Sequence, residues 1–123
     1  MLGLDANILL GYDTNMRAEL IIAEVRTVFD DGSFTEVVVW RVPEPVPPSE
    51  HPFKYSLVYI VDGARVLGFD NERGKGDHKH EDGIETKYEF SSIDTVLEDF
   101  VVAVENWRLS HVEDADRSRA VVP

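Results

Sequence analysis

The sequence predicts a single-domain α+β protein, in which an antiparallel sheet of about five strands, arranged as a hairpin meander, is covered on one face by an amphipathic C-terminal helix. Three observations support this class. Apolar and polar residues alternate through much of residues 18–69, which is the period-two pattern of half-buried strands. Turn signals at Asp30–Gly32 and Asp62-Gly63 separate neighbouring runs, as in hairpins. After residue 90 the apolar spacing changes to three and four residues, which is typical of a helix with one apolar side.

Length and composition fit one folded domain. The 123 residues are 43% hydrophobic and 10% aromatic, enough to bury a core of its own. We expect this domain to span residues 18–109. Residues 1–17 show no clear pattern and stay unassigned, whereas residues 110–123 are charged and lose the helical period, so a flexible tail is expected there.

The individual elements follow from local pattern. Residues 43–52 hold five of the six prolines, and proline removes ladder donors, so this segment is expected to be an extended connector. The helix is expected to start at Ser91 or Ser92 as its cap, with Asp94 in the first turn, and to end at Leu109. Strands are predicted at residues 18–29, 33–42, 53–62, 64–69 and 85–90.

Several classes of protein are excluded or disfavoured by composition. The chain has no cysteine, so neither a disulfide nor a thiolate metal site can form. No apolar run approaches the ~18 residues of a membrane span, and the first residues lack the pattern of a signal peptide. A soluble, cytoplasmic protein that does not partner a membrane is the expectation, while its oligomeric state is left undetermined.

The net charge of −12 bears on the choice of partner. Long-range repulsion opposes binding to nucleic acid, because such binding depends on lysine and arginine at the phosphates. The segment Asp70–Gly83 has three basic and five acidic residues, a formal −2, which leaves −10 for the rest of the chain. This segment is therefore the least repulsive place for RNA, and a basic protein partner explains the acidity equally well.

Asp70–Gly83 is also the stretch richest in reactive groups, and we expect it to be a surface loop. It holds two of the four histidines, His78 and His80, with Arg73, Lys75 and Lys79. Imidazoles titrate near neutrality and serve as general acid and base. If the segment is extended, residues two apart face the same side. The set then suits RNA cleavage without a metal or other cofactor, with His78 and His80 transferring protons and Lys79 or Arg73 holding the phosphate.

Two other interpretations of the segment stay open. His78 and His80 with Asp77 or Asp70 resemble a partial zinc site with three ligands and one open position; the metal set we would choose is His78, His80 and Asp77. A solvated hairpin loop that keeps a sheet edge soluble is the simplest alternative. Beyond these, Lys75 between two glycines is a possible phosphate contact, and Arg41 at the end of a predicted strand could reach an anion.

The chain resembles the small bacterial and archaeal proteins of the TumE toxin family. The residues that carry the likeness are VVWRVPEPVPP at 38–48, FKYSLVYIVD at 53–62 and GFDNERGKGDHKH at 68–80, within a similarity that runs from about residue 18 to residue 108. Its most specific part is an aspartate–asparagine pair closing a strand before a histidine-rich loop, here Asp70-Asn71 and then His78 and His80. The resemblance implies a toxin that inhibits growth, pairing with a helix-turn-helix antitoxin, with RNA as a possible target and Asp70 and Asn71 as binding residues.

The sequence therefore leaves two candidate functions. The first is a toxin-like component of a toxin–antitoxin pair that acts as a metal-independent ribonuclease through its histidine-rich loop. The second is a binding module without catalytic activity, whose acidic surface docks a basic protein partner.

Overall fold

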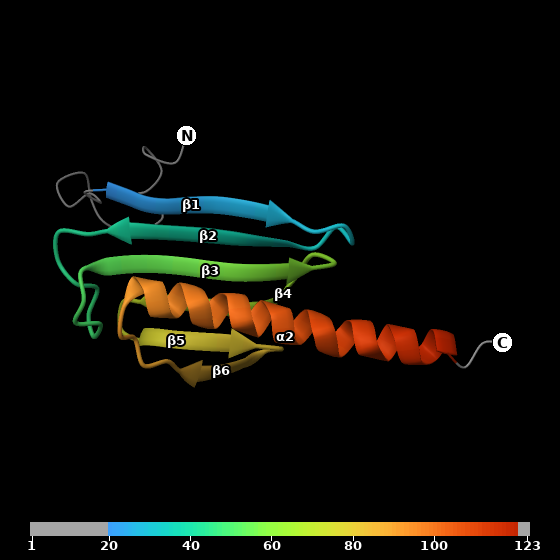
Figure 1. Cartoon of the computed structure of the whole chain (residues 1–123). Helices are drawn as coiled ribbons and strands as arrows, with labels where there is room; N and C mark the ends of the chain where they lie inside the picture. Colours follow the sequence, from blue (N-terminus) through green and yellow to red (C-terminus); the bar gives the residue numbers. More distant parts are fainter. Residues whose placement is uncertain (1–19, 121–123) are drawn as a thin grey trace. The chain divides into compact units, whose positions relative to one another are not determined.

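The computed structural model describes residues 20–120, and it is an α+β protein as predicted. Six antiparallel strands form one sheet in the order β1-β2-β3-β4-β5-β6, so every strand pairs with its neighbours in sequence (Figure 1). One long helix, α2, follows the sheet. The described chain divides into two compact units, the sheet unit up to Phe90 and the helix unit from Ser91. The packing of the helix on one face of the sheet stays a prediction.

The period-two pattern of burial is clearest in β3. Its inward residues on one face, Tyr55, Leu57 and Tyr59, each have 0% exposure. We call this the core face, and alternation along neighbouring strands adds Val39, Leu67 and Phe69 to it. The first four strands are β1 Leu20–Val28, β2 Phe34–Arg41, β3 Phe53–Val61 and β4 Ala64–Glu72.

The expected loop at Asp70–Gly83 is wrong, because most of it is a hairpin. Strand β4 continues to Glu72, and β5 runs through Gly76–Glu81. Gly74 and Gly76 have φ of 87° and 78°, a left-handed conformation that glycine adopts without strain, and they allow the tight reversal between the strands. The sequence pattern missed β5 and the last three residues of β4 because polar cross-strand pairs, in place of alternating apolar side chains, occupy them.

The strand beyond the five predicted is β5, and a second turn joins it to β6. Asp82 and Gly83 have φ of 49° and 85°, the paired positive values of a type I′ hairpin turn. Strand β6 is therefore Ile84–Lys87, shorter than the strand expected at residues 85–90 and one residue earlier in its start.

The connector at residues 43–52 contains no strand, as predicted, and it lies against the turn between β4 and β5. The amide of Gly74 donates to the carbonyl of Pro47 over 2.8 Å. Pro48 packs beside Gly76, with its Cγ 3.1 Å from where a Cβ on that glycine would be. The proline-rich segment therefore supports the turn that precedes β5.

The helix unit is longer than predicted. Helix α2 spans Ile93–Ala120, so residues expected in a tail are helical as far as Ala120. The hydroxyl of Ser92 accepts a hydrogen bond from the Thr95 amide over 3.0 Å, which makes Ser92 the N-cap. Val96, Phe100 and Val104 of the predicted apolar side are buried, whereas Val101 is exposed. The unassigned segment 1–17 lies outside the described residues.

Candidate functional site

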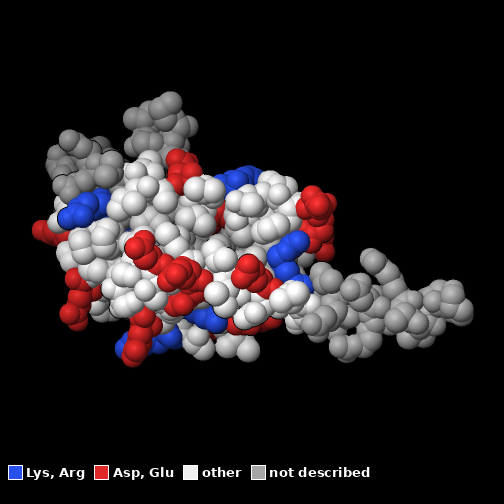
Figure 2. Space-filling view, in the orientation of Figure 1, with Lys and Arg blue, Asp and Glu red and all other residues white. Residues whose placement is uncertain are grey.

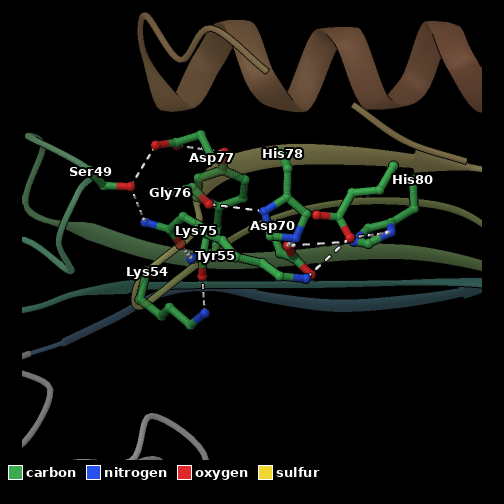
Figure 3. Close-up of polar contacts among 11 residues, drawn as sticks. Ser49, Lys54, Tyr55, Asp70, Lys75, Gly76, Asp77, His78 and His80 are labelled. Atoms are coloured by element: carbon green, nitrogen blue, oxygen red, sulfur yellow. Dashed lines mark hydrogen bonds and ion pairs between the residues drawn. The ribbon is translucent and has the colours of Figure 1, made fainter. Parts of the chain in front are cut away.

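The hairpin of β4 and β5 brings an aspartate and two histidines to one face of the sheet. Asp70 on β4 pairs directly with His78 on β5, and Gly68 pairs with His80. Directly opposed residues share a face, as do residues two apart along a strand. Asp70, His78 and His80 therefore lie together on the face opposite the core face, which we call the site face (Figure 3).

The three side chains are within contact distance of one another. Asp70 Oδ1 lies 2.6 Å from His78 Nε2 and 4.0 Å from His80 Nε2. The two imidazole rings are 4.7 Å apart between centroids and nearly perpendicular, at 78°. We call Asp70, His78 and His80 the His–Asp cluster.

His78 is held rigidly and is almost completely buried. Its side chain is 4% exposed, and its Nδ1 donates a hydrogen bond of 2.9 Å to the carbonyl of Gly76. Since Nδ1 carries a proton, the neutral ring presents a lone pair at Nε2 to the Asp70 carboxylate. Two acceptors this close require a proton or another cation to be shared between them.

The contact between these two atoms is short but poorly aligned. Despite the separation of 2.6 Å, Nε2 of His78 and Oδ1 of Asp70 have no hydrogen bond of acceptable geometry among the described residues. A hydrogen bond weakens steeply when its angle is poor, so the short distance alone does not make a strong bond between these two atoms. Both atoms are buried and unsatisfied, which is costly and calls for an explanation.

His80 is the more accessible imidazole, and its surroundings favour its neutral form. Burial lowers the pKa of His80, and the positive charge of Arg65 lowers it further, which outweighs the opposite effect of Asp70. Its side chain is 15% exposed. At neutral pH a ring of this kind is ready to accept a proton.

Arg65 reaches His80 because of two features of β4. A register shift between Tyr59 and Ile60 pairs Ile60 with Arg65, and this bulge puts Arg65 on the site face, where simple alternation from Leu67 would not. Gly68 then leaves room for the arginine side chain, whose Cδ lies 3.1 Å from the position of a Cβ on that glycine.

Lys54 supplies a second cation beside the cluster. Burial lowers the pKa of Lys54, although the nearby carboxylates, Asp70 first among them, oppose the shift. Its ammonium group donates to the backbone carbonyl of Asn71 (Figure 3). Lys87 on β6 pairs directly with His78, so three basic residues absent from the sequence-based set, Lys54, Arg65 and Lys87, lie on the site face.

The predicted phosphate contacts are placed elsewhere. Lys79 lies between the two histidines in sequence and so faces the core side, where its ammonium is 3.3 Å from Glu81 and 5.5 Å from the centre of the Phe69 ring. Arg73 is in the exposed turn between β4 and β5. The structure therefore does not join Lys79 to the histidines.

Lys75 and Arg41 are likewise not part of the His–Asp cluster. The ammonium of Lys75 bonds Glu85 over 3.2 Å, and this hydrogen bond is the main cause that lowers the pKa of Glu85. Glu85 in turn lies 3.8 Å from Nδ1 of His80. Arg41 ends β2 with its guanidinium 6.0 Å from the centre of the Phe53 ring.

Asp77, the carboxylate chosen for the metal alternative, lies on the core face and is fully engaged. It accepts hydrogen bonds from Ser49 over 2.5 Å and from Tyr55 over 2.7 Å, and it pairs with His51 over 2.8 Å. Burial alone would raise the pKa of Asp77, but the bonds from His51, Ser49 and Tyr55 lower it. Asp70 takes its place as the carboxylate next to the two histidines.

Asn71, expected to bind a ligand, has a structural position. It is 0% exposed, its Oδ1 accepts from the Tyr55 amide over 3.0 Å, and its Nδ2 donates to the Phe53 carbonyl over 2.7 Å. The backbone ladder between β3 and β4 ends at Ser56 and Asp70. The side-chain amide of Asn71 thus continues the ladder by one step and fixes β4 next to Asp70.

Comparison with protein families agrees with this pattern of residues. The family model described as Toxin TumE matches residues 11–108 of the chain, which include the whole sheet unit of the described structure and the cluster. The chain belongs to the TumE toxin family. Its toxin-like role follows from this membership.

The other two comparisons identify no further similar protein. Neither the curated proteins nor the solved structures give a significant match to the chain. Within residues 20–120, no helix combines the length and apolar character required to cross a membrane.

Proposed function

We propose that this TumE family protein is the toxin of a toxin–antitoxin pair and that its His–Asp cluster cleaves cytoplasmic RNA without a metal ion. The observation that carries the proposal is the meeting of His78 and His80 with Asp70 on one face, with their ligating atoms within 4.8 Å of one another. Two imidazoles in one place supply both proton transfers that cleavage of an RNA phosphodiester needs.

The reaction assigns a different task to each histidine. His80, kept neutral by its lowered pKa, takes the proton of the ribose 2′-hydroxyl, whose oxygen attacks the phosphorus. The bond from phosphorus to the 5′-oxygen breaks, and that oxygen receives a proton from Nε2 of His78, the nitrogen that faces Asp70. The products are a 2′,3′-cyclic phosphate and a 5′-hydroxyl end, so atoms and charge balance without a cofactor.

Arg65 is the group we assign to the phosphate. It is exposed and lies near His80 on the site face, and a guanidinium binds phosphate oxygens in a two-pronged fashion. Lys54 and Lys87 add positive charge on the same face. These cations balance the neighbouring carboxylates of Asp70 and Glu85, so the site face repels RNA less than the net charge of −12 implies.

Growth and RNA cleavage test the proposal together. Induction of the wild-type chain should arrest growth, and the purified, chelator-treated protein should produce RNA fragments with 2′,3′-cyclic phosphate ends. His80→Ala should lower the cleavage rate by roughly 10²–10⁴-fold, the usual contribution of a general acid or base. Arg65→Gln should weaken RNA binding. The matched changes Lys79→Gln and His111→Gln, the latter at an exposed histidine of α2, should leave both readouts unchanged.

The opposite results would end the ribonuclease proposal. If His80→Ala remained as toxic as the wild type at equal protein levels, the imidazole would not be the base. Equal losses in Lys79→Gln and Arg65→Gln would show that charge in general, and no particular site, causes the effect.

An acidic face on α2 favours a second function, the docking of a basic partner. Within residues 93–111 of this helix four carboxylates are exposed, those of Asp94, Glu98, Asp99 and Glu105, and Figure 2 shows that acidic side chains outnumber basic ones on the visible face. We propose that a helix-turn-helix antitoxin with a basic surface binds here. Association should then weaken with added salt and in a Glu98→Lys/Glu105→Lys variant, yet survive His80→Ala; binding that ignores salt and charge reversal would refute this surface.

A further inference from the structure

We propose that Asp70, His78 and His80 form a zinc-binding site with three protein ligands and one open position. The inference concerns metal binding alone and does not depend on RNA cleavage. It rests on the placement of three ligating atoms, on two buried polar atoms that lack a partner, and on the groups that hold the rings.

The donor atoms are already gathered. One carboxylate oxygen from β4 and one ring nitrogen from each histidine of β5 lie within 4.8 Å of one another. Two imidazoles with one carboxylate form a ligand set that zinc accepts, and a catalytic or exchangeable site keeps a fourth position open. No movement of the backbone is needed to bring the ligands from different parts of the fold, because they are neighbours in one hairpin.

The distances are close to those of a bound ion. With zinc bonds of ~2.0–2.1 Å in a tetrahedral arrangement, neighbouring donor atoms are separated by about 3.3 Å. Here Asp70 Oδ1 is 2.6 Å from His78 Nε2 and 4.0 Å from His80 Nε2. Each separation differs from the required one by about 0.7 Å, which small side-chain rotations can supply.

The unsatisfied atoms favour a cation at this place. His78 Nε2 and Asp70 Oδ1 are buried, close together, and without a hydrogen bond of acceptable geometry among the described residues. The imidazole of His78 is more than nine-tenths buried. A metal ion between the two atoms would satisfy both lone pairs at once, whereas a direct hydrogen bond is misaligned.

The surroundings of the rings also match a metal site. A histidine ligand usually donates its second ring proton to a carbonyl or carboxylate, which orients the ring. His78 makes this bond to the Gly76 carbonyl over 2.9 Å, and His80 has Glu85 at 3.8 Å from its Nδ1. Both rings therefore present Nε2 toward Asp70, and His78 has a hydrogen-bonded partner on its other nitrogen, while Glu85 lies near that of His80 beyond hydrogen-bond distance.

Zinc at this position would occupy the same nitrogens that acid–base catalysis uses. With both Nε2 atoms bound to metal, neither ring could exchange a proton with RNA. Chelator-treated protein is for this reason the form in which RNA cleavage is assayed, and metal binding is measured in the absence of RNA.

Titration of the full chain with metal tests the site directly. Protein stripped with a chelator is titrated with Zn²⁺ by calorimetry and with Co²⁺ by visible absorption, which reports tetrahedral coordination. One equivalent should bind, and Asp70→Asn and His80→Gln should each weaken binding by at least about 10-fold. Zn²⁺ should also raise the melting temperature of the wild type and not of these variants, because a ligand of the native state stabilises it.

His51→Gln is the matched control, since His51 and Asp77 form another close histidine–carboxylate pair, at 2.8 Å, on the core face. This variant should bind Zn²⁺ with unchanged stoichiometry and affinity. Circular dichroism establishes that each variant is folded, and His80→Gln preserves the test if Asp70→Asn does not fold, because His80 is partly exposed. Absence of saturable binding, or one equivalent bound equally by wild type and by folded His80→Gln, would overturn the proposal.

Discussion

Replacing Asn71 by alanine should destabilise the protein severely without removing any group that does chemistry. Asn71 is fully buried, and its amide satisfies the Tyr55 N–H and the Phe53 carbonyl at the end of the ladder between β3 and β4. A third bond, from Nδ2 to the Ser49 hydroxyl, is long at 3.4 Å and contributes little.

The size of the loss follows from the two groups left without a partner. An unsatisfied buried donor or acceptor costs about 1–3 kcal/mol, so the pair amounts to roughly 2–6 kcal/mol. A small domain has only about 5–15 kcal/mol of stability in total. We therefore expect Asn71→Ala to lose a large share of the free energy of unfolding and to melt at least about 10 °C lower.

Denaturation in urea, followed by circular dichroism, measures this free energy for the wild type and the variant. Glu72→Ala is the control, because Glu72 is the next residue on β4 and is exposed, and surface changes of this type stay within about 0.5 kcal/mol. A loss below about 1 kcal/mol in Asn71→Ala would refute the structural role and return Asn71 to the set of ligand-binding residues.

Three further predictions concern the surroundings of the cluster. The pKa of His80, followed by NMR titration, should lie below its usual value near 6.5 and rise in Arg65→Gln. The stability that neutral His80 contributes should be complete above that usual value and be lost as pH falls through the lowered pKa. A titration unaffected by Arg65→Gln would contradict the contribution assigned to Arg65. Gly76→Ala should lower the free energy of unfolding by about 1–3 kcal/mol because of the positive φ. It should also impair cleavage or zinc binding, because Pro48 crowds this position and the carbonyl of Gly76 holds His78. Gly74→Ala, with a similarly positive φ but open space around it, should lose stability alone, and equal effects of the two changes on function would count against the role of Gly76. Asp77→Asn should destabilise the protein by about 3 kcal/mol, since hydrogen bonds to a charged acceptor are the stronger ones. Because the pKa of Asp77 is lowered from 3.8, the wild type should lose this contribution as pH falls through the lowered value, while the variant does not. Identical acid unfolding curves for the two proteins would argue against this role of Asp77.

The strands that alternate in hydrophobicity could be predicted from the sequence, and those built on polar pairs could not. The strand predicted at residues 53–62 is confirmed as β3, because every second side chain there is apolar and the middle three, Tyr55, Leu57 and Tyr59, are buried. Strand β5 carries Asp77, His78 and His80, whose partners lie across the sheet or in the connector, so no local pattern shows that they are paired. The missed strand β5 had a usable signal at its end, since Asp82-Gly83 repeats the turn dipeptide of Asp62-Gly63.

The histidines of the candidate site could be found by composition, but the groups around them could not. His78 and His80 stand out because two imidazoles occur two residues apart. Their common face follows once the segment is known to be a strand, and the same rule sends Lys79 to the opposite face. Lys54 is too distant in sequence to be linked with them, and Arg65 reaches the site face only through an irregularity in pairing.

That irregularity makes the length of β4 as influential as its composition. One extra residue between Arg65 and Leu67 sets the side of the sheet to which the guanidinium belongs. Shortening or lengthening this stretch by a single residue would add or withdraw a full positive charge next to His80 while leaving every side chain of the His–Asp cluster in place. A one-residue insertion or deletion here should therefore change the charge at the site more than most substitutions on β4 would.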